Sequence, residues 1–196
     1  MRRLAIAVLA GALCGAVFMS GPVHAQAFLR NDRFDDSIRR AVRLYLPAQD
    51  WRWWKAQLAA ESRLDPRARS PVGAEGIAQF MPATWREVLP AIGLDPKLVP
   101  RTEASVAIEA GAFYMARLWR QWTGWSGTRG QDAYDHAIAG YNAGSGHILR
   151  AWRACGRPRP WDATVTCLPQ ITGRHAAETR GYVVRIRSYF RALIAG

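Results

Sequence analysis

The chain has 196 residues, a formal net charge of +12 and a hydrophobic content of 49%. This length fits one domain, and the basic charge favours polyanionic partners. No stretch alternates basic and aromatic residues as known nucleic-acid motifs do, so we expect no nucleic-acid partner.

The first 25 residues have the pattern of a secretory signal peptide. Arg2 and Arg3 form a basic start, residues 4–19 are almost wholly apolar, and Val23-His24-Ala25 offers a small-residue cleavage site. The apolar stretch is too short for a confident membrane span, and no later stretch is long enough. The sequence therefore predicts a leader that is removed.

Cleavage near Ala25 leaves one mature domain, residues 26–196, without an integral membrane segment. We expect this domain to be periplasmic or secreted, and an uncleaved anchor is the alternative. In an exported protein of this kind, polyanionic partners are cell-wall polymers or membrane surfaces more than nucleic acid.

The first predicted helix of the mature chain begins at a cap, Asn31 or Asp32, and ends at Pro47. The residues of its inward side recur at helical spacing: Phe34, Ile38, Val42 and Tyr45.

The second predicted helix, residues 50–64, holds a carboxylate in an unusual position. Trp54, Leu58 and Glu61 stand at i, i+4 and i+7, so a helix places all three on one face. Desolvation at the end of an apolar stripe favours the protonated form, which a general acid needs near neutral pH. An arbitrary glutamate is more often a water-facing helix-end residue. We interpret most of the nine tryptophans as packing residues.

A turn-rich loop follows this helix. The chain is predicted to leave the helix at Asp65-Pro66, because the residue before a proline is steered away from the helical conformation. The stretch SPVGAEG contains two glycines, and a short helix from Pro82 to Ile92, interrupted at Pro90, comes next. A tight turn of this kind brings backbone groups and Gln79 close to a ligand.

The remaining chain is predicted to be helical. After a linker at residues 93–101, Thr102 caps a long helix that Trp122 ends, and residues 124–130 form a Gly-rich connection. Its inward residues are Val106, Ala110, Phe113 or Tyr114, and Leu118.

Three further features complete the all-α prediction. Asp132 caps a helix that Gly144 terminates, and Ser145 caps the next one. A last helix, from about residue 174 to residue 194, carries Glu178, Tyr182, Ile186 and Phe190 on one side. We find no alternating strand pattern and no internal repeat, so the fold class is a single all-α domain.

Cys155 and Cys167 remain once the leader is removed with Cys14. Two cysteines in an exported chain most simply form one disulfide, here closing an Arg- and Pro-rich loop. Metal binding is the competing interpretation, but His147 and His175 match no zinc spacing. We therefore expect no metal and no cofactor.

Three separated motifs carry a family resemblance. They are Glu61-Ser62 followed by Ser70-Pro71-Val72-Gly73-Ala74 and Gly76-x-x-Gln79-x-Met81-Pro82; Ala139-Gly140-Tyr141-Asn142-Ala143-Gly144; and Glu178-Thr179-Arg180-Gly181-Tyr182-Val183. In this order they closely resemble the catalytic core of the soluble lytic transglycosylase family, over a stretch from about residue 53 to residue 189. The resemblance implies a lysozyme-like helical domain that cleaves the glycan strands of bacterial peptidoglycan.

The resemblance also implies a reaction in which Glu61 acts twice. It first protonates the glycosidic oxygen between N-acetylmuramic acid and N-acetylglucosamine. As a base, it then takes the proton of the muramic acid C6 hydroxyl, which attacks C1 and closes a 1,6-anhydro ring. Glycosidases usually need two carboxylates, whereas Asp65 is expected to be a helix-end cap or a loop contact. Having one obvious acid agrees with this reaction.

Roles for the first group of site residues follow from the resemblance, each beside a plainer alternative. Ser62 orients the acid or bonds the backbone, and Ser70 contacts the muramic acid region or simply starts a turn. Gln79 suits an N-acetyl group or a lactyl side chain. Met81 lines the cleft or fills the core.

The second group lies later in the chain. Tyr141 is expected to hold the Glu61 carboxyl through its hydroxyl, and Asn142 to cap or brace its turn. Glu178 hydrogen-bonds peptide or sugar or else faces solvent, and Tyr182 shares its helix face. Two positions depart from the family pattern. Ala78 stands where the family often has methionine, and Gly140 stands where a second alanine is common.

Other functions stay open at this stage. A lysozyme-type muramidase would release reducing ends, a wall-binding or assembly protein would bind with little turnover, and a cationic membrane-active protein would permeabilise vesicles. The expected partner is the peptidoglycan glycan strand, and an envelope-spanning machine is a further possible partner. The protein is expected to be a monomer. Wall recycling, secretion, conjugation, flagellar assembly and phage entry all fit, with endo or exo cleavage.

Overall fold

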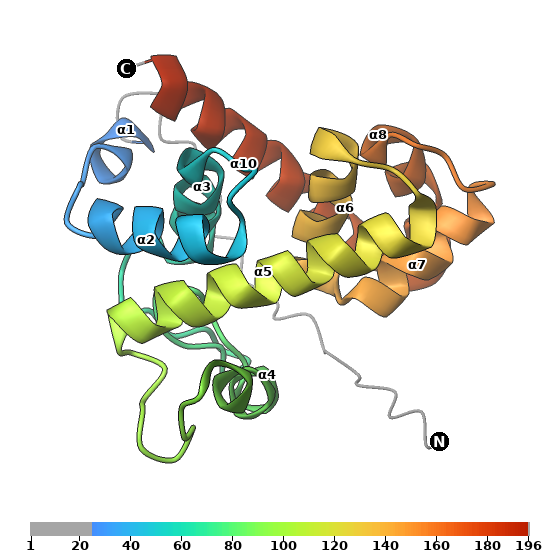
Figure 1. Cartoon of the computed structure of the whole chain (residues 1–196). Helices are drawn as coiled ribbons and strands as arrows, with labels where there is room; N and C mark the ends of the chain where they lie inside the picture. Colours follow the sequence, from blue (N-terminus) through green and yellow to red (C-terminus); the bar gives the residue numbers. More distant parts are fainter. Residues whose placement is uncertain (1–24, 196) are drawn as a thin grey trace. The chain divides into compact units, whose positions relative to one another are not determined.

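The computed structural model describes residues 25–195, which form two compact units (Figure 1). We call residues 25–116 and 184–195 the α3 unit, and Arg117–Val183 the α6 unit. Helices α5 and α10 each contribute residues to both units. The predicted leader lies outside the described residues except for its last residue.

The α3 unit is built from short and medium helices around one core. Its elements are α1 (Ala25–Leu29), α2 (Asp35–Tyr45), α3 (Trp51–Ser62), α4 (Pro82–Val88), the 3₁₀ helix η1 (Leu89–Ile92), the first half of α5 (Ala104–Ser126) and the last part of α10 (Ala176–Ala195). The described chain contains no strand beyond isolated bridges that join Glu75 to Arg69 and Phe80. The all-α prediction is confirmed.

Helix α3 is the centre of this unit. Trp54 and Leu58 are fully buried, and the indole Nε1 of Trp54 donates to the carbonyl of Ile108 on α5 over 3.2 Å. Gly111 makes this approach possible, because a Cβ there would lie 2.5 Å from the Trp54 ring. The buried Lys55 ammonium meets the Asp35 carboxylate of α2 at 2.6 Å, so an ion pair joins the two helices.

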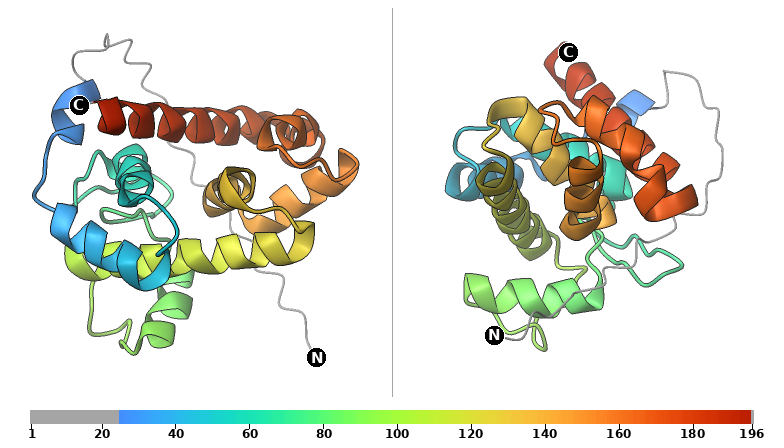
Figure 2. Two further views of the ribbon diagram at one scale, coloured as in Figure 1. Left: turned by 45° about the horizontal axis from the view of Figure 1, so that its top comes forward. Right: turned by 90° about the vertical axis from the view of Figure 1, so that its right-hand side faces the viewer.

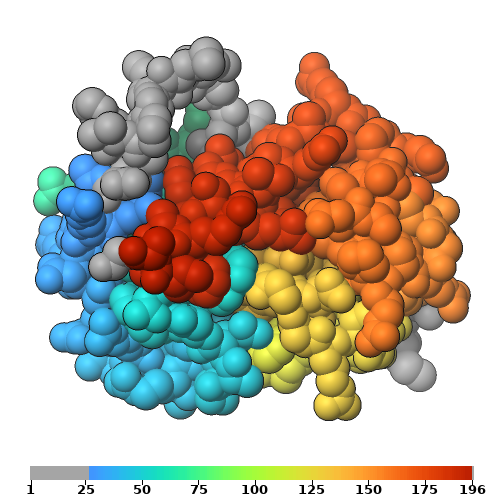
Figure 3. Space-filling view, turned by 90° about the horizontal axis from the view of Figure 1, so that it is seen from above, coloured from blue at the N-terminus to red at the C-terminus, as the bar shows by residue number. Residues whose placement is uncertain are grey.

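The end of α10 packs on α3 and α1 through aromatic rings. Trp53 stacks on Phe190 with centroids 3.9 Å apart and planes 9° apart. Phe28 of α1 meets Tyr189 edge-on at 5.4 Å. In Figure 3 the last residues of α10, in red, lie over the cyan atoms of α3. The sequence analysis assigned no helix to α1, which is only five residues long.

The α6 unit has its own core. Its elements are the second half of α5, α6 (Gly130–Ala143), α7 (Ser145–Ala154), α8 (Trp161–Thr164), η2 (Val165–Cys167), α9 (Pro169–Thr172), η3 (Gly173–His175) and the start of α10; α6 and α7 are seen side by side in Figure 2. Trp122 stacks on the buried His136 ring at 4.2 Å. The His136 Nδ1 lies 2.6 Å from the Asp132 carbonyl and therefore carries a proton, and Nε2 lies 2.7 Å from the Thr164 hydroxyl.

Several predicted helix caps were wrong. Asn31 accepts from the Arg33 N–H in a turn, and α2 starts after Phe34 without a side-chain cap. Helix α5 starts at Ala104, so Thr102 is not its cap, and α6 starts before Asp132. Ser145 is the first residue of α7 rather than its cap.

Two helices also end at residues other than the predicted ones, and the structure shows why. Helix α3 stops at Ser62, before the predicted exit at Asp65-Pro66, because Arg63 and Leu64 adopt the left-handed conformation with φ values of 57° and 64°. Helix α5 continues past Trp122 to Ser126, where the Ser126 hydroxyl donates to the Trp122 carbonyl. Trp125 also packs edge-on against Trp122, and this packing extends the helix.

The predicted disulfide is present. Cys155 and Cys167 are joined, with their Cα atoms 5.7 Å apart. The enclosed loop is more ordered than its composition suggested, since Trp161 is buried and the Trp152 indole donates to the Pro158 carbonyl over 2.8 Å. Packing and cross-link therefore both hold this loop.

Replacing both Cys155 and Cys167 by serine is expected to lower the free energy of unfolding by about 3 kcal/mol, because the open loop gains conformational freedom in the unfolded chain. Urea denaturation of the wild type and of the double variant measures this difference. Dithiothreitol should shift the wild-type midpoint to that of the variant and leave the variant unchanged. Equal midpoints for the oxidised wild type and the variant would contradict the prediction.

Within residues 25–195, none of the helices combines the length and the apolar character that crossing a membrane requires.

Candidate active site

The nine predicted site residues divide between the two units. The α3 unit contains Glu61, Ser62, Ser70, Gln79 and Met81, and the α6 unit contains Tyr141, Asn142, Glu178 and Tyr182.

Glu61 lies in the last turn of α3, at the end of the apolar stripe that the sequence predicted. Trp54 and Leu58 are both inaccessible to solvent, whereas Glu61 is half-buried. The helix ends one residue later, so the carboxyl group stands beside the start of the loop and at the negative end of the helix dipole. Its surroundings are therefore apolar on one side and accessible on the other.

Ser62 ties the end of α3 to the loop that follows. Its hydroxyl lies 2.8 Å from the Ile77 carbonyl and 3.3 Å from the Leu58 carbonyl, and a single hydroxyl proton serves one acceptor at a time. The shorter contact fixes Ile77 against the turn that carries Glu61. Of the two roles left open for Ser62, the structure supports the bond to the backbone.

The segment from residue 68 to residue 80, which we call the glycine loop, is closed by its own hydrogen bonds. The Ser70 hydroxyl accepts from the Ala74 N–H at 2.9 Å, and the Ser70 N–H donates to the Ala74 carbonyl at 2.9 Å. The Gly73 N–H also donates to the Ser70 carbonyl, over 3.1 Å. Ser70 therefore starts a turn, as its plainer interpretation had it, and its half-buried hydroxyl keeps its proton for another acceptor.

Gln79 has a left-handed backbone conformation, and only the nitrogen of its side-chain amide is hydrogen-bonded within the loop. Its φ of 49° is unusual for a residue other than glycine. The side-chain Nε2 donates to the carbonyls of Gly76 (2.9 Å) and Ala68 (3.2 Å), and Oε1 is the side-chain atom that can accept from another donor. Met81 follows as the extended residue before α4, half-buried, with Pro82 in the first helical turn.

Arg101 is the important residue that the sequence analysis missed. Its Nη1 donates to the carbonyls of Gly73 (2.6 Å) and Phe80 (2.8 Å), and its Nη2 lies 2.9 Å from the Glu75 carboxylate. One guanidinium therefore fastens both arms of the glycine loop. Arg101 lies in the stretch interpreted as a linker, and no short-range pattern connects it to a loop more than twenty residues earlier.

In the α6 unit, Asn142 braces two helices. Its Oδ1 accepts from the Thr179 hydroxyl at 2.8 Å, which joins the end of α6 to the start of α10. Tyr141, the preceding residue, is half-buried. Tyr182 is almost fully buried and so belongs to the core. Glu178 is half-buried, and its Oε1 is shielded from solvent without a hydrogen-bond partner among residues 25–195.

A family model described as the transglycosylase SLT domain matches residues 47–162, more than half of the chain. The chain belongs to this family. The matched stretch of the SLT domain includes Glu61, the glycine loop and Tyr141, but it ends before Glu178.

Similar proteins agree with this assignment of the SLT domain. The chain is 31% identical over 183 residues to a membrane-bound lytic murein transglycosylase F of Maricaulis maris, covering 83% of this chain and 38% of that protein. It is 28% identical over 184 residues to the protein of the same name from Actinobacillus pleuropneumoniae, covering 81% and 36%. The chain therefore spans less than half the length of these relatives.

Solved structures share the fold of this SLT domain. The 70 kDa soluble lytic transglycosylase of Escherichia coli matches with a TM-score of 0.62 and 25% identity, over 83% of this chain and 24% of that one. An inactive mutant of the lytic transglycosylase Slt from Pseudomonas aeruginosa matches with a TM-score of 0.64 and 26% identity, over 81% and 23%. These matches confirm the lysozyme-like, all-α prediction.

Proposed function

We propose that this chain is a peptidoglycan lytic transglycosylase. It cleaves the β-1,4 bond between N-acetylmuramic acid and N-acetylglucosamine without water and leaves 1,6-anhydromuramic acid ends. The observation that carries the proposal is the position of Glu61, a half-buried carboxyl at the end of a buried apolar stripe, in a member of the SLT family.

Glu61 serves as both acid and base in the proposed reaction. The first step requires Glu61 in its protonated form, because the leaving oxygen must receive a proton. The carboxyl proton passes to the glycosidic oxygen as the bond to C1 breaks. The carboxylate then accepts the C6 hydroxyl proton while that oxygen bonds to C1, so Glu61 ends the cycle protonated and no water is consumed.

The nearby carboxylates support a reaction with a single acid. The exposed Asp65 accepts from the Arg67 N–H at 2.8 Å within its turn, as a loop contact. Glu75 is held between Arg69 and Arg101, each 2.9 Å away. A hydrolase of the usual kind needs a second carboxylate that is free to act as a nucleophile or base.

The remaining site residues are proposed to bind the glycan. Gln79 Oε1 accepts from an N-acetyl N–H, Ser70 donates to the muramic acid region and Met81 forms an apolar wall. Ser62 positions the loop beside Glu61. The resemblance assigns a hydrogen bond with peptide or sugar to Glu178, whose helix face Tyr182 shares. It assigns the holding of the acid to Tyr141 and the bracing of its own turn to Asn142. We also propose a periplasmic or secreted location with glycan strands as the partner.

Mass spectrometry of the soluble products released from purified peptidoglycan tests this function. Fragments ending in 1,6-anhydromuramic acid, absent from a parallel digest with the Glu61→Gln variant, are expected. Reducing-end fragments, heavier by one water, would establish a muramidase instead. Sedimentation of the protein with peptidoglycan but no released fragment would favour a wall-binding or assembly protein.

A further inference from the structure

A concave basic surface lies where α2 approaches the start of α3, at the other end of α3 from Glu61. This hollow has a volume of about 470 Å³. We call it the basic hollow, and its lining includes Arg39, Val42, Arg43, Pro47, Trp51 and Arg52. We propose that it binds the carboxylates of a short acidic peptide, and in particular the free stem peptides of peptidoglycan.

The charge of the hollow is incompletely neutralised. Arg39 and Arg43 form no ion pair with any described residue, whereas Arg52 is paired with Asp50 at 3.0 Å. Three guanidinium groups therefore face one carboxylate. Two positive charges remain available to an anionic ligand.

Trp51 holds one of these charges in a defined place. The Arg39 guanidinium carbon lies 4.3 Å from the Trp51 ring centroid, and the half-buried ring also has Arg52 at 5.4 Å and Lys55 at 5.7 Å. A guanidinium stacked on an aromatic face keeps its in-plane N–H groups directed outward. Such a fork matches the two oxygens of a carboxylate.

Asp50 does not block an anion from the hollow, because both of its oxygens are already engaged. One oxygen accepts from the Arg52 N–H at 2.9 Å and caps α3, and the other accepts from the Arg52 side chain at 3.0 Å. The acidic group is thus occupied in holding the start of the helix.

The shape of the hollow favours a small peptide over a lipid surface. Its volume falls within the range of small-ligand sites, about 300–1,000 Å³. The buried Val42 and the exposed Pro47 add apolar surface for side-chain methylenes. Trp51 is covered by Arg39 and so is not presented for insertion into a membrane.

The basic hollow and Glu61 lie at opposite ends of α3. Trp51 and Glu61 are ten positions apart in α3, which corresponds to about 15 Å of helix axis. Peptide binding can therefore be measured without turnover. The choice of stem peptides as the natural source of the carboxylates rests on the proposed function, whereas carboxylate binding does not.

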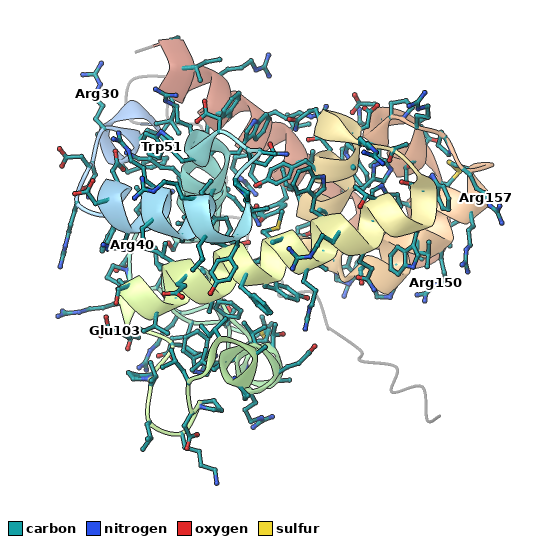
Figure 4. All side chains as sticks on the ribbon, in the orientation of Figure 1. Arg30, Arg40, Trp51, Glu103, Arg150 and Arg157 are labelled. Carbon is teal, nitrogen blue, oxygen red and sulfur yellow. A yellow bond between two sulfur atoms is a disulfide. The ribbon has the colours of Figure 1, made fainter. Side chains whose placement is uncertain are left out.

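Isothermal titration calorimetry with a synthetic stem tetrapeptide, L-Ala-γ-D-Glu-diaminopimelate-D-Ala, tests the proposal. The double variant Arg39→Gln/Arg43→Gln should bind at least tenfold more weakly than the wild type. The matched control Arg30→Gln/Arg40→Gln removes the same charge from exposed residues outside the hollow, which are labelled with Trp51 in Figure 4, and should bind as the wild type does. The tetrapeptide with amidated carboxylates should also lose at least tenfold.

Phosphatidylglycerol vesicles are titrated in parallel. Three outcomes would overturn the proposal: the wild type does not bind the peptide, the two double variants lose peptide affinity equally, or the Arg39→Gln/Arg43→Gln variant loses affinity for the vesicles alone. The last would identify a lipid phosphate as the anion. A parallel digest of peptide-free glycan strands by the Arg39→Gln/Arg43→Gln variant should still give anhydro products. Failure of the proposed function would remove those products from the wild type as well, and would leave the peptide titration unaffected.

Discussion

Replacement of Glu61 by glutamine should reduce the release of soluble fragments from peptidoglycan by roughly 10³-fold, because removal of a general acid or base typically costs 10²–10⁴-fold. Glutamine has nearly the same shape as glutamate but cannot supply a proton to the leaving oxygen or take one from the C6 hydroxyl. The variant should keep the wild-type melting temperature and still sediment with peptidoglycan. Chromatography of released muropeptides measures the rate, and circular dichroism measures the melting.

Glu103→Gln is the matched control. Glu103 is an exposed residue just before α5 whose side-chain carboxylate accepts from the Ser105 hydroxyl at 3.0 Å, and it is labelled in Figure 4. This variant should retain wild-type release. Release by Glu61→Gln within tenfold of the wild type would remove Glu61 from its proposed role.

The second large effect is expected from Gly76→Ala, which should cost about 3 kcal/mol or more of stability. Gly76 has a φ of 83°, where an alanine loses roughly 1–2 kcal/mol. An added Cβ would also lie 2.0 Å from the Arg101 carbonyl oxygen, and this backbone atom cannot move aside without disturbing the loop. A loss of this size lowers the melting temperature by roughly 10 °C in a chain of this length.

Gly73→Ala separates the two contributions. Gly73 has a similar φ of 88°, but nothing lies within 4 Å of the position that an added Cβ would take. It should therefore lose only the conformational part and keep most of its activity. Gly76→Ala should also lose glycan cleavage, because Gln79 and Ser70 depend on the same loop. Equal melting temperatures for the two variants would refute the steric argument.

Much of the fold followed from local pattern. Trp54, Leu58 and Glu61 form a face because helical periodicity requires it, and Pro82 and Gly144 mark boundaries through their own backbone preferences. Caps were less predictable because several polar residues compete at each helix start. Arg63 and Leu64 illustrate the limit, since neither residue type signals the left-handed conformation that ends α3.

The candidate site could be predicted only where its residues are close in sequence. Glu61, Ser62 and the glycine loop form a nearly continuous stretch, so motif and geometry agree there. The part played by Arg101 depends on a tertiary approach that no spacing reveals. The basic hollow was missed for the same reason: Arg39 and Arg43 lie on α2, and only the fold brings them beside Trp51.

The Arg101 contacts also limit how this loop can be transplanted. A designer who moved residues 68–80 into another helical scaffold would carry over the whole recognisable motif yet leave behind the cation that fastens it. Glu75 would then be paired only with Arg69, which is 78% exposed, and the carbonyls of Gly73 and Phe80 would lose their shared donor. A successful graft must therefore include an arginine supplied from outside the motif.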